Sequence, residues 1–342
     1  MSIRIAVIGA GIMGEDHARI IAQDLPGATL HVVCDASSER AKLIADRYGA
    51  ADVSTDPLFT LSRSDVDAII IASPDETHAG LTMAAIEAGK PALCEKPLSQ
   101  SPDQCLAVID REMSQGRHFV QLGFMRRFDP SYREMKNALS DGVIGRAVMM
   151  HNFHRNVEAP ANFSGQMAIS NSAPHEFDVA RHVLDTEYVA ISVFQPAHTS
   201  KDGVGAPVFM VLETREGQLV NIEINNNAHY GYDVRGELVG EQGSVQLATP
   251  VHARFNTRLQ GFEKYAADWR PRFADAYRLQ NKAFVEFINT GIFPAFAANA
   301  WDGYCAAVVA QAGIEALNQR RRVVLPTLQA PPFYQPHEGA TS

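Results

Sequence analysis

Residues 5–14 read Ile-Ala-Val-Ile-Gly-Ala-Gly-Ile-Met-Gly, an apolar run that ends in three glycines with the spacing G-x-G-x-x-G. This spacing is typical of the turn between a strand and a helix that binds a dinucleotide. Gly9 permits the tight turn, Gly11 lets the backbone approach a pyrophosphate, and Gly14 lets the helix pack close to the sheet. The N-terminus of that helix, with its free N–H groups and its dipole, would then bind the phosphates.

An acidic residue after the next apolar run strengthens this prediction, because three glycines alone also occur in ordinary turns. The run at 29–34 ends at Asp35, where a carboxylate can accept hydrogen bonds from the adenosine ribose. Such a carboxylate repels a 2′-phosphate, so the sequence predicts NAD rather than NADP. Asp35 can also serve as a turn or helix-capping residue. Arg40 nearby can accommodate a 2′-phosphate, so NADP stays open as the alternative.

The composition is that of a globular protein large enough for two domains. Of its 342 residues, 46% are hydrophobic and 20% are charged. A net charge of −9 argues against nucleic-acid binding, and no apolar run approaches the roughly 20 residues of a membrane span. The four cysteines form no C-x-x-C pair and are expected to be buried thiols of a reducing compartment. Because the first strand leaves no room for a signal peptide, we expect a cytoplasmic protein.

Strand and helix patterns alternate along residues 1–124. Continuous apolar runs such as Ala-Ile-Ile-Ile-Ala at 68–72 are what a parallel sheet covered on both faces requires. We therefore expect a doubly wound α/β domain of the Rossmann type, with ligand-binding residues at the carboxyl ends of its strands. The expected strands are 3–8, 29–34, 67–72, 92–95 and 118–123.

After Arg127 the pattern changes: helices are expected near 130–140 and near 174–184, and the extended segments from 189 onward then follow one another without intervening helices. This succession predicts an α+β domain at 125–330 with a large, mostly antiparallel, open-faced sheet, followed by an irregular tail at 331–342. The open face predicts a homo-oligomer, a dimer or a tetramer. The expected helices are 130–140, 174–184, 275–290 and 300–318, and the expected extended segments are 146–154, 189–195, 207–214, 218–228, 234–240 and 244–248.

Glu95-Lys96-Pro97 follows the strand expected at 92–95 and carries the first candidate catalytic group. A lysine at this strand end can hydrogen-bond a reacting hydroxyl and stabilise its oxygen as hydride leaves. For Lys96 taken alone, a solvated lysine that opens a loop is the simpler alternative. Pro97 permits a cis peptide bond. In the loop after the strand at 67–72, His78 can position the cofactor-side loop and Asp75 can cap the turn.

No metal site is expected from the histidines of the second domain. His151 and His154 are three residues apart in an extended segment, where their side chains point to opposite faces. No third ligand follows at a usable spacing.

The motifs taken together resemble one family. The glycine turn with Glu95-Lys96-Pro97 is similar to the glucose-fructose oxidoreductase and inositol dehydrogenase family, above all to its bacterial inositol 2-dehydrogenases. The resemblance covers essentially the whole chain and implies NAD-dependent oxidation of a secondary alcohol of a cyclic polyol. Five further segments carry it in the same order: Gly-Phe-Met-Arg-Arg-Phe-Asp-Pro at 123–130, His-Arg-Asn at 154–156, His-Glu-Phe-Asp at 175–178, Tyr-Gly-Tyr-Asp at 230–233 and Ala-Trp-Asp-Gly-Tyr at 300–304.

The resemblance implies roles for individual residues. Lys96 and His175 would be catalytic, with His175 as the base that takes the hydroxyl proton, a role that a neutral imidazole suits. Packing, capping and domain-bridging roles stay as alternatives for the substrate positions. The implied substrate contacts are Arg126, His154, Asn156, Tyr230 and Tyr232, and the expected cofactor contacts are Gly9, Gly11, Ile12, Met13, Gly14, Asp35, Ser73, Pro74, His78, Glu95 and Lys96.

One position departs from the family pattern. The family has an aspartate four residues before the catalytic histidine, where this chain has Asn171. An asparagine accepts no proton, but it can hydrogen-bond a substrate hydroxyl. We therefore expect Asn171 to bind a substrate that need not be myo-inositol. The alternatives are a pyranose oxidised at C1 or C3 and, in another class, a nucleotide-sensing regulator without turnover, which the presence of Lys96 and His175 disfavours.

Overall fold

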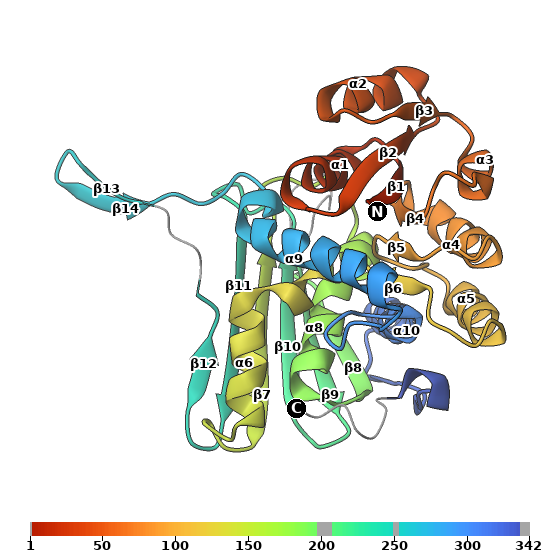
Figure 1. Cartoon of the computed structure of the whole chain (residues 1–342). Helices are drawn as coiled ribbons and strands as arrows, with labels where there is room; N and C mark the ends of the chain where they lie inside the picture. Colours follow the sequence, from red (N-terminus) through yellow and green to blue (C-terminus); the bar gives the residue numbers. More distant parts are fainter. Residues whose placement is uncertain (1, 197–206, 249–252, 336–342) are drawn as a thin grey trace. The chain divides into compact units, whose positions relative to one another are not determined.

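The computed structural model describes residues 2–196, 207–248 and 253–335 (Figure 1). The chain forms two compact units, the first from Met1–Phe128, Asp275–Ala307 and Gln329–Ser342, the second from Asp129–Ala274 and Val308–Leu328. This division differs from the two continuous domains that we expected. The reason is that α9 (Trp269–Thr290) and α10 (Ala300–Gln319) each contribute residues to both units.

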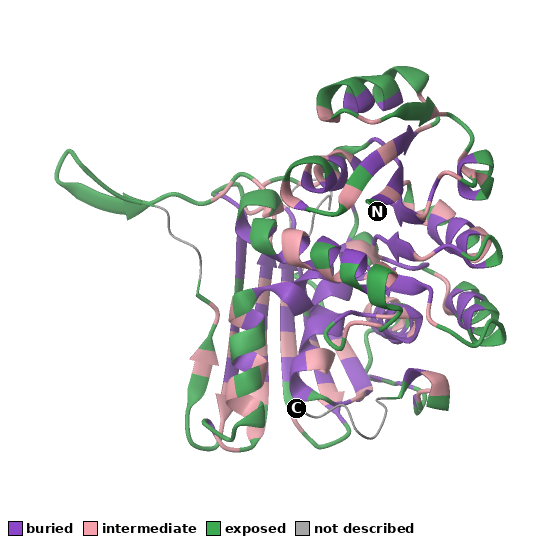
Figure 2. Cartoon of the chain, in the orientation of Figure 1, coloured by how far each residue is buried: buried purple, intermediate pink, exposed green. Residues whose placement is uncertain are grey.

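The first unit contains a six-stranded parallel sheet in the order β3-β2-β1-β4-β5-β6. This is the strand order of a doubly wound dinucleotide-binding fold, and it confirms the predicted fold class. β4 is buried along its whole length, and β1 is buried at every residue except the half-buried Arg4, as their apolar runs require (Figure 2). The strands are β1 (Ile3–Ile8), β2 (Ala28–Cys34), β3 (Asp52–Ser54), β4 (Ala68–Ile71), β5 (Ala92–Cys94) and β6 (Val120–Leu122).

Local signals set the ends of several helices in this unit. The Ser37 side chain accepts a hydrogen bond from the Arg40 backbone at the start of α2, and Asp56 caps α3 in the same way. The predicted irregular tail begins with a short helical turn, η4 (Pro332–Tyr334), in which the Tyr334 hydroxyl donates a hydrogen bond to the buried Glu112 carboxylate. Residues 336–342 of the tail lie outside the described residues. The other helices are α1 (Ile12–Asp24), α2 (Ser38–Tyr48), α3 (Pro57–Ser62), η1 (Asp75–Thr77), α4 (His78–Glu87), α5 (Pro102–Ser114) and η2 (Met125–Phe128).

The second unit is built on a seven-stranded sheet in the order β12-β11-β7-β10-β9-β8-β15. Only the pair of β7 and β10 is parallel among the pairings of the described residues, so the sheet is mostly antiparallel, as predicted. Its strands are β7 (Ala147–Arg155), β8 (Tyr188–Phe194), β9 (Val208–Thr214), β10 (Leu219–Asn225), β11 (Asp233–Gly240), β12 (Ser244–Gln246) and β15 (Val323–Val324). Its helices are α6 (Pro130–Ser140), α7 (Gly165–Met167), η3 (Ala168–Ser172) and α8 (Pro174–Leu184).

The two faces of this sheet differ in burial. Along β7, Met150, Asn152 and His154 are buried, whereas His151 and Phe153 are half-buried. The alternation places His151 and His154 on opposite faces, as expected. The same alternation recurs in β9 and β10, so one face is covered and the other stays partly exposed.

A hairpin that the sequence did not predict follows the sheet. β13 (Arg254–Thr257) and β14 (Gln260–Glu263) pair antiparallel, and every residue of both strands is exposed. The rings of Phe255 and Phe262 stack with centroids 5.4 Å apart. The ribbon of this hairpin stands clear of the β-sheet of its unit in Figure 1.

All four cysteines, Cys34, Cys94, Cys105 and Cys305, are free and buried, which confirms the expected buried thiols. Across the described part of the chain, no helix combines the length and the apolar character needed to cross a membrane.

Candidate active site

The glycine turn between β1 and α1 has the geometry that its spacing predicts. Gly9 has φ +102°, and a Cβ there would lie 2.3 Å from the Ala72 carbonyl oxygen. A Cβ on Gly14 would lie 1.8 Å from the Gly9 carbonyl oxygen, so helix and turn touch at this point. A Cβ on Gly11 would meet nothing within 4 Å. Two glycines therefore serve packing, and the third leaves open space where a phosphate can approach the backbone.

The start of α1 suits an anionic group. Gly11 is the N-cap and provides no side-chain hydrogen bond to the first turn. The N–H groups of a first helical turn have no intrahelical acceptor, and the helix dipole at this end favours negative charge. These features fit the pyrophosphate of a dinucleotide.

Asp35 links the glycine turn to the loop after β2. Its Oδ2 accepts a hydrogen bond from the Ala10 backbone N at 2.8 Å, and its Oδ1 accepts from Ser37 N and Arg40 Nη2, each at 2.8 Å. Burial acts to raise the pKa of Asp35, but these three donors outweigh it and hold that pKa below its usual value. Asp35 is therefore ionised at neutral pH, as an acceptor for ribose hydroxyls must be. The N-cap of α2 is Ser37 and not Asp35.

The ends of β1, β4 and β5 lie side by side because these strands are neighbours in the sheet. They carry Gly9, Ser73 and Lys96, so three predicted site segments gather at one edge. Lys96 is half-buried, and its bond to Pro97 is cis, as its sequence permitted.

Two buried histidines contact the loops that follow β4 and β5 at this sheet edge. His78 opens α4, and its ring nitrogens face the carbonyl oxygens of Ser73 and Pro97 at 2.9 and 2.7 Å. His17 of α1 contacts the Glu95 carboxylate at 2.9 Å. Sequence analysis missed His17, because its partners are distant in the chain and no spacing connects them.

In the second unit, His175 lies buried in the first turn of α8. Its neighbour Glu176 is fully buried and bonds His154 Nδ1 at 3.2 Å. The ring of Tyr232 stands edge-on to that of His154, with centroids 6.0 Å apart. Three of the predicted residues, with Glu176, thus lie around the start of one helix. Glu176 was part of the quoted motif but had received no role.

Amide side chains extend this cluster. Asn156 Nδ2 donates to Asn226 Oδ1 at 3.1 Å, and Asn226 Nδ2 donates to Ser172 Oγ at 3.0 Å. Asn171 precedes Ser172 in η3, a single π-helical turn directly before α8, and accepts a hydrogen bond from Ser170. Such turns are frequent at functional sites.

Two other predicted substrate residues have different surroundings. Tyr230 is half exposed, donates to Asp233 Oδ2 at 2.6 Å and accepts from Arg155 Nη1 at 3.0 Å. Arg126, in η2 of the first unit, is fully buried.

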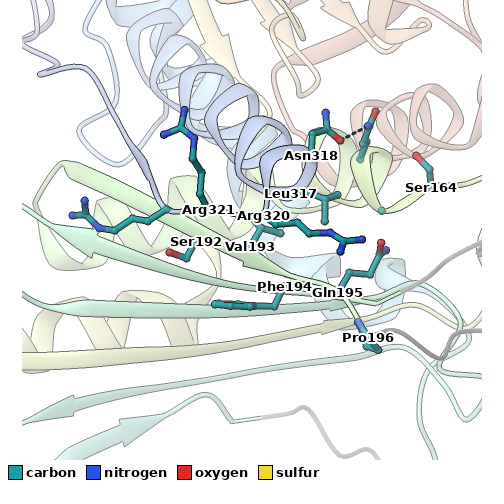
Figure 3. Close-up of a pocket in the computed structure, with 13 residues that line it drawn as sticks. Ser164, Ser192, Val193, Phe194, Gln195, Pro196, Leu317, Asn318, Arg320 and Arg321 are labelled. Atoms are coloured by element: carbon teal, nitrogen blue, oxygen red, sulfur yellow. Dashed lines mark hydrogen bonds between the residues drawn. The ribbon is translucent and has the colours of Figure 1, made fainter.

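A hollow of about 1060 Å³ in the second unit contains none of the predicted site residues (Figure 3). Its lining includes Arg320, Arg321 and Arg322 but no acidic side chain. Arg321 and Arg322 are paired with Glu315 and Glu213, at 2.9 and 2.6 Å. Among the described residues, no group of three or more metal-ligating side chains is present.

The fold and these strand ends define a class, the NAD-dependent oxidoreductases. Residues 3–124 match an oxidoreductase family with an NAD-binding Rossmann fold, and residues 132–246 match the GFO/IDH/MocA C-terminal domain. The chain belongs to this family, which confirms the predicted resemblance.

Named relatives and solved structures are similar over full length. The chain is 43% identical to inositol 2-dehydrogenase 2 of Saccharopolyspora erythraea, over 98% of this chain and 99% of that protein. It is 38% identical to inositol 2-dehydrogenase of Klebsiella pneumoniae, over 98% and 100%. The crystal structure of myo-inositol dehydrogenase from Lactobacillus casei in complex with NAD(H) and myo-inositol matches with a TM-score of 0.93 at 28% identity, over 98% of this chain and 100% of that one. This protein is thus an NAD-dependent dehydrogenase of the inositol dehydrogenase type.

Proposed function

We propose that this protein oxidises a secondary hydroxyl of an inositol-like cyclic polyol to a ketone, with Lys96 and His175 as its catalytic residues. The observation that carries the proposal is the set of neighbouring strand ends in the first unit. The glycine turn, Ser73 and Lys96 share one sheet edge, so a dinucleotide on the turn extends toward a lysine. The named relatives and their NAD-bound neighbour support the substrate class.

The reaction removes a hydride and a proton from the alcohol. NAD, when bound, supplies the acceptor of the hydride. Lys96 donates a hydrogen bond to the reacting oxygen and stabilises negative charge on it as the C–H bond breaks. His175 takes the hydroxyl proton, so the products are the ketone, NADH and one proton.

The remaining polar residues of the second unit orient the substrate. A cyclic polyol presents several neutral hydroxyls, which require mixed donors and acceptors. His154, Asn156 and Tyr232 supply both kinds of group, and the buried Glu176 fixes the His154 ring. Arg126 is the proposed contact from the first unit.

Asn171 distinguishes this chain from the family pattern. Where the family has a carboxylate, an amide contributes hydrogen bonds but no charge beside the base. We infer that Asn171 binds a substrate hydroxyl and widens the choice of substrate. Asn171→Asp should then change the pH profile of kcat and the ranking of substrates; an unchanged profile and ranking would refute this role.

The direct test follows NADH at 340 nm with a panel of inositol isomers and aldoses. We expect turnover with at least one inositol, and loss of about 10³-fold or more in kcat for Lys96→Met and His175→Ala. Lys42→Met is the matched control, because Lys42 is an exposed lysine of the same unit. Turnover of aldoses alone would favour the pyranose alternative. NADH binding without turnover of any panel member would favour the nucleotide-sensing regulator.

We further propose that a second copy of the chain covers the open face of the seven-stranded sheet. Phe194 and Phe209 form a cross-strand pair there and are 57% and 40% exposed. Neighbouring exposed aromatic side chains are typical of a subunit interface. Light scattering should show a dimer or a tetramer, with Phe209→Asp shifted toward the monomer and Val143→Asp, another exposed apolar site, unchanged.

The cysteines support a cytoplasmic location. Four buried free thiols suit a reducing compartment.

A further inference from the structure

The segment that carries Lys96 is held from both sides by buried histidines. His17 of α1 contacts Glu95, the residue before the lysine, and His78 of α4 contacts Pro97, the residue after it. Both rings are almost fully excluded from solvent, at 0% and 1% exposure. We propose that His17 and His78 are positioning residues that fix the Lys96 backbone and so place its ammonium group for the reaction. This inference rests on the catalytic role proposed for Lys96.

Hydrogen positions on His17 follow from its partners. Asn281 Nδ2 donates to the Tyr277 carbonyl oxygen at 3.0 Å, so Asn281 Oδ1 faces His17 Nδ1 at 3.1 Å. An amide oxygen accepts only, hence Nδ1 carries a hydrogen. The other nitrogen, Nε2, lies 2.9 Å from Glu95 Oε1, so one hydrogen bond joins the ring to the Glu95 carboxyl group in a buried site.

The Glu95 carboxylate connects His17 to the backbone of Lys96. Its second oxygen, Oε2, accepts a hydrogen bond from the Lys96 backbone N at 3.3 Å. A Cβ on residue 123 would lie 2.9 Å from that oxygen, so Gly123 leaves the room that the carboxylate needs. A continuous chain of bonds therefore runs from α9 through His17 to the backbone of Lys96.

His78 joins two loops at the same sheet edge. Both of its ring nitrogens face carbonyl oxygens, and a carbonyl can only accept, so both nitrogens must donate and the ring is an imidazolium. Burial acts to lower the pKa of His78, but the Cys94 sulfur and the two carbonyls outweigh it and raise that pKa to about 10. The ring thus ties the loop after β4 to the loop after β5 at neutral pH.

Positioning of this kind has a characteristic kinetic effect. Displacement of a catalytic group by about 1 Å costs up to about 100-fold in rate, while ligands that bind elsewhere are little affected. We expect His17→Leu and His78→Leu to lower kcat by about 10- to 100-fold. In both variants the deuterium isotope effect on the transferred hydrogen should rise. In His17→Leu, which alters no expected cofactor contact, NADH affinity measured by fluorescence should stay within about threefold of the native value.

Matched variants separate positioning from loss of structure. His17→Gln keeps one donor toward Glu95 and should recover part of kcat. His31→Leu is the control, because His31 makes the same kind of bond, to Asp65 at 2.9 Å, in the same unit and should leave kcat unchanged. If His17→Leu does not fold, Asn281→Leu loosens the same chain of bonds one step further away.

The decisive comparison uses Lys96→Met as the background in single-turnover measurements. The inference requires that His17→Leu causes little further loss there, since no ammonium group remains to be placed. A full additive loss in that background, or an equal loss of kcat and NADH affinity, would overturn it. Full activity of Lys96→Met alone would instead refute the proposed function of Lys96.

Discussion

Substitution of Gly14 by alanine tests the packing of the nucleotide-binding turn most directly. The new Cβ would lie 1.8 Å from the Gly9 carbonyl oxygen and 2.7 Å from its carbonyl carbon. Both atoms belong to the backbone, so no side-chain rotation relieves the clash. Helix α1 must move by about 1.5–2 Å to restore van der Waals contact at roughly 3.5 Å. Overpacking of this kind costs about 1–3 kcal/mol in the free energy of unfolding.

The movement of α1 should also weaken the binding of the cofactor, because the N–H groups that hydrogen-bond the phosphates lie at the N-terminus of this helix. We expect Gly14→Ala to lower both the urea midpoint and the NADH affinity, the latter by at least about tenfold, which corresponds to about 1.4 kcal/mol.

Gly11→Ala gives the opposite pattern. A Cβ on residue 11 meets nothing within 4 Å, and its φ of −79° suits alanine, so stability should be unchanged. The methyl group would point into the open space where the backbone approaches the pyrophosphate, so NADH affinity should fall. Gly80→Ala, equally free of contacts, should leave both properties intact or raise stability slightly. Equal urea midpoints for Gly14→Ala and Gly11→Ala would refute the reasoning.

Three further predictions concern charge and burial. Asp35→Ser removes the carboxylate and releases Arg40 from its 2.8 Å ion pair. The ratio of kcat/KM for NADP to kcat/KM for NAD should therefore rise by about 10- to 100-fold. An unchanged ratio would show that Asp35 does not exclude the 2′-phosphate of NADP. Because the pKa of His78 is raised, its contribution to stability is complete below pH 6.5 and is lost as the pH rises through about 10. The loss of unfolding free energy in His78→Gln relative to the native protein, measured in urea, should therefore shrink between pH 6.5 and 10. A loss that stays constant over this range would contradict the imidazolium. Tyr334→Phe removes a donor to the buried Glu112 and should cost about 1–2 kcal/mol in unfolding free energy; an unaltered melting curve would show that this bond adds nothing.

Features with a local sequence signal could be predicted. Residues 5–8 of β1 and all of β4 are continuously apolar because both faces of a parallel sheet are covered. α6 and α8 lie where helices were predicted, near 130–140 and near 174–184, and each has a proline at its start. Gly9, Gly11 and Gly14 have the surroundings that their spacing indicated.

Features without a local signal were missed. β3 is an edge strand of three residues, Asp52–Ser54, with no apolar run to mark it. The turn of the β13–β14 hairpin uses Arg258 and Leu259, both at positive φ, where Asn-Gly is the usual pattern. His17 and Asn281 are joined across 264 positions of the chain, a contact that only the fold creates.

The four cysteines allow the local opening of one unit to be measured by the rate at which their thiols are labelled. All four belong to the first unit, and burial raises the pKa of the Cys34 thiol and that of Cys105, the latter to about 12. All four thiols are buried, so a thiol-specific dye can reach them only when that unit opens. The labelling rate would report local opening around the nucleotide site in the unmodified protein, and its slowing by NADH would measure how far the cofactor closes the unit.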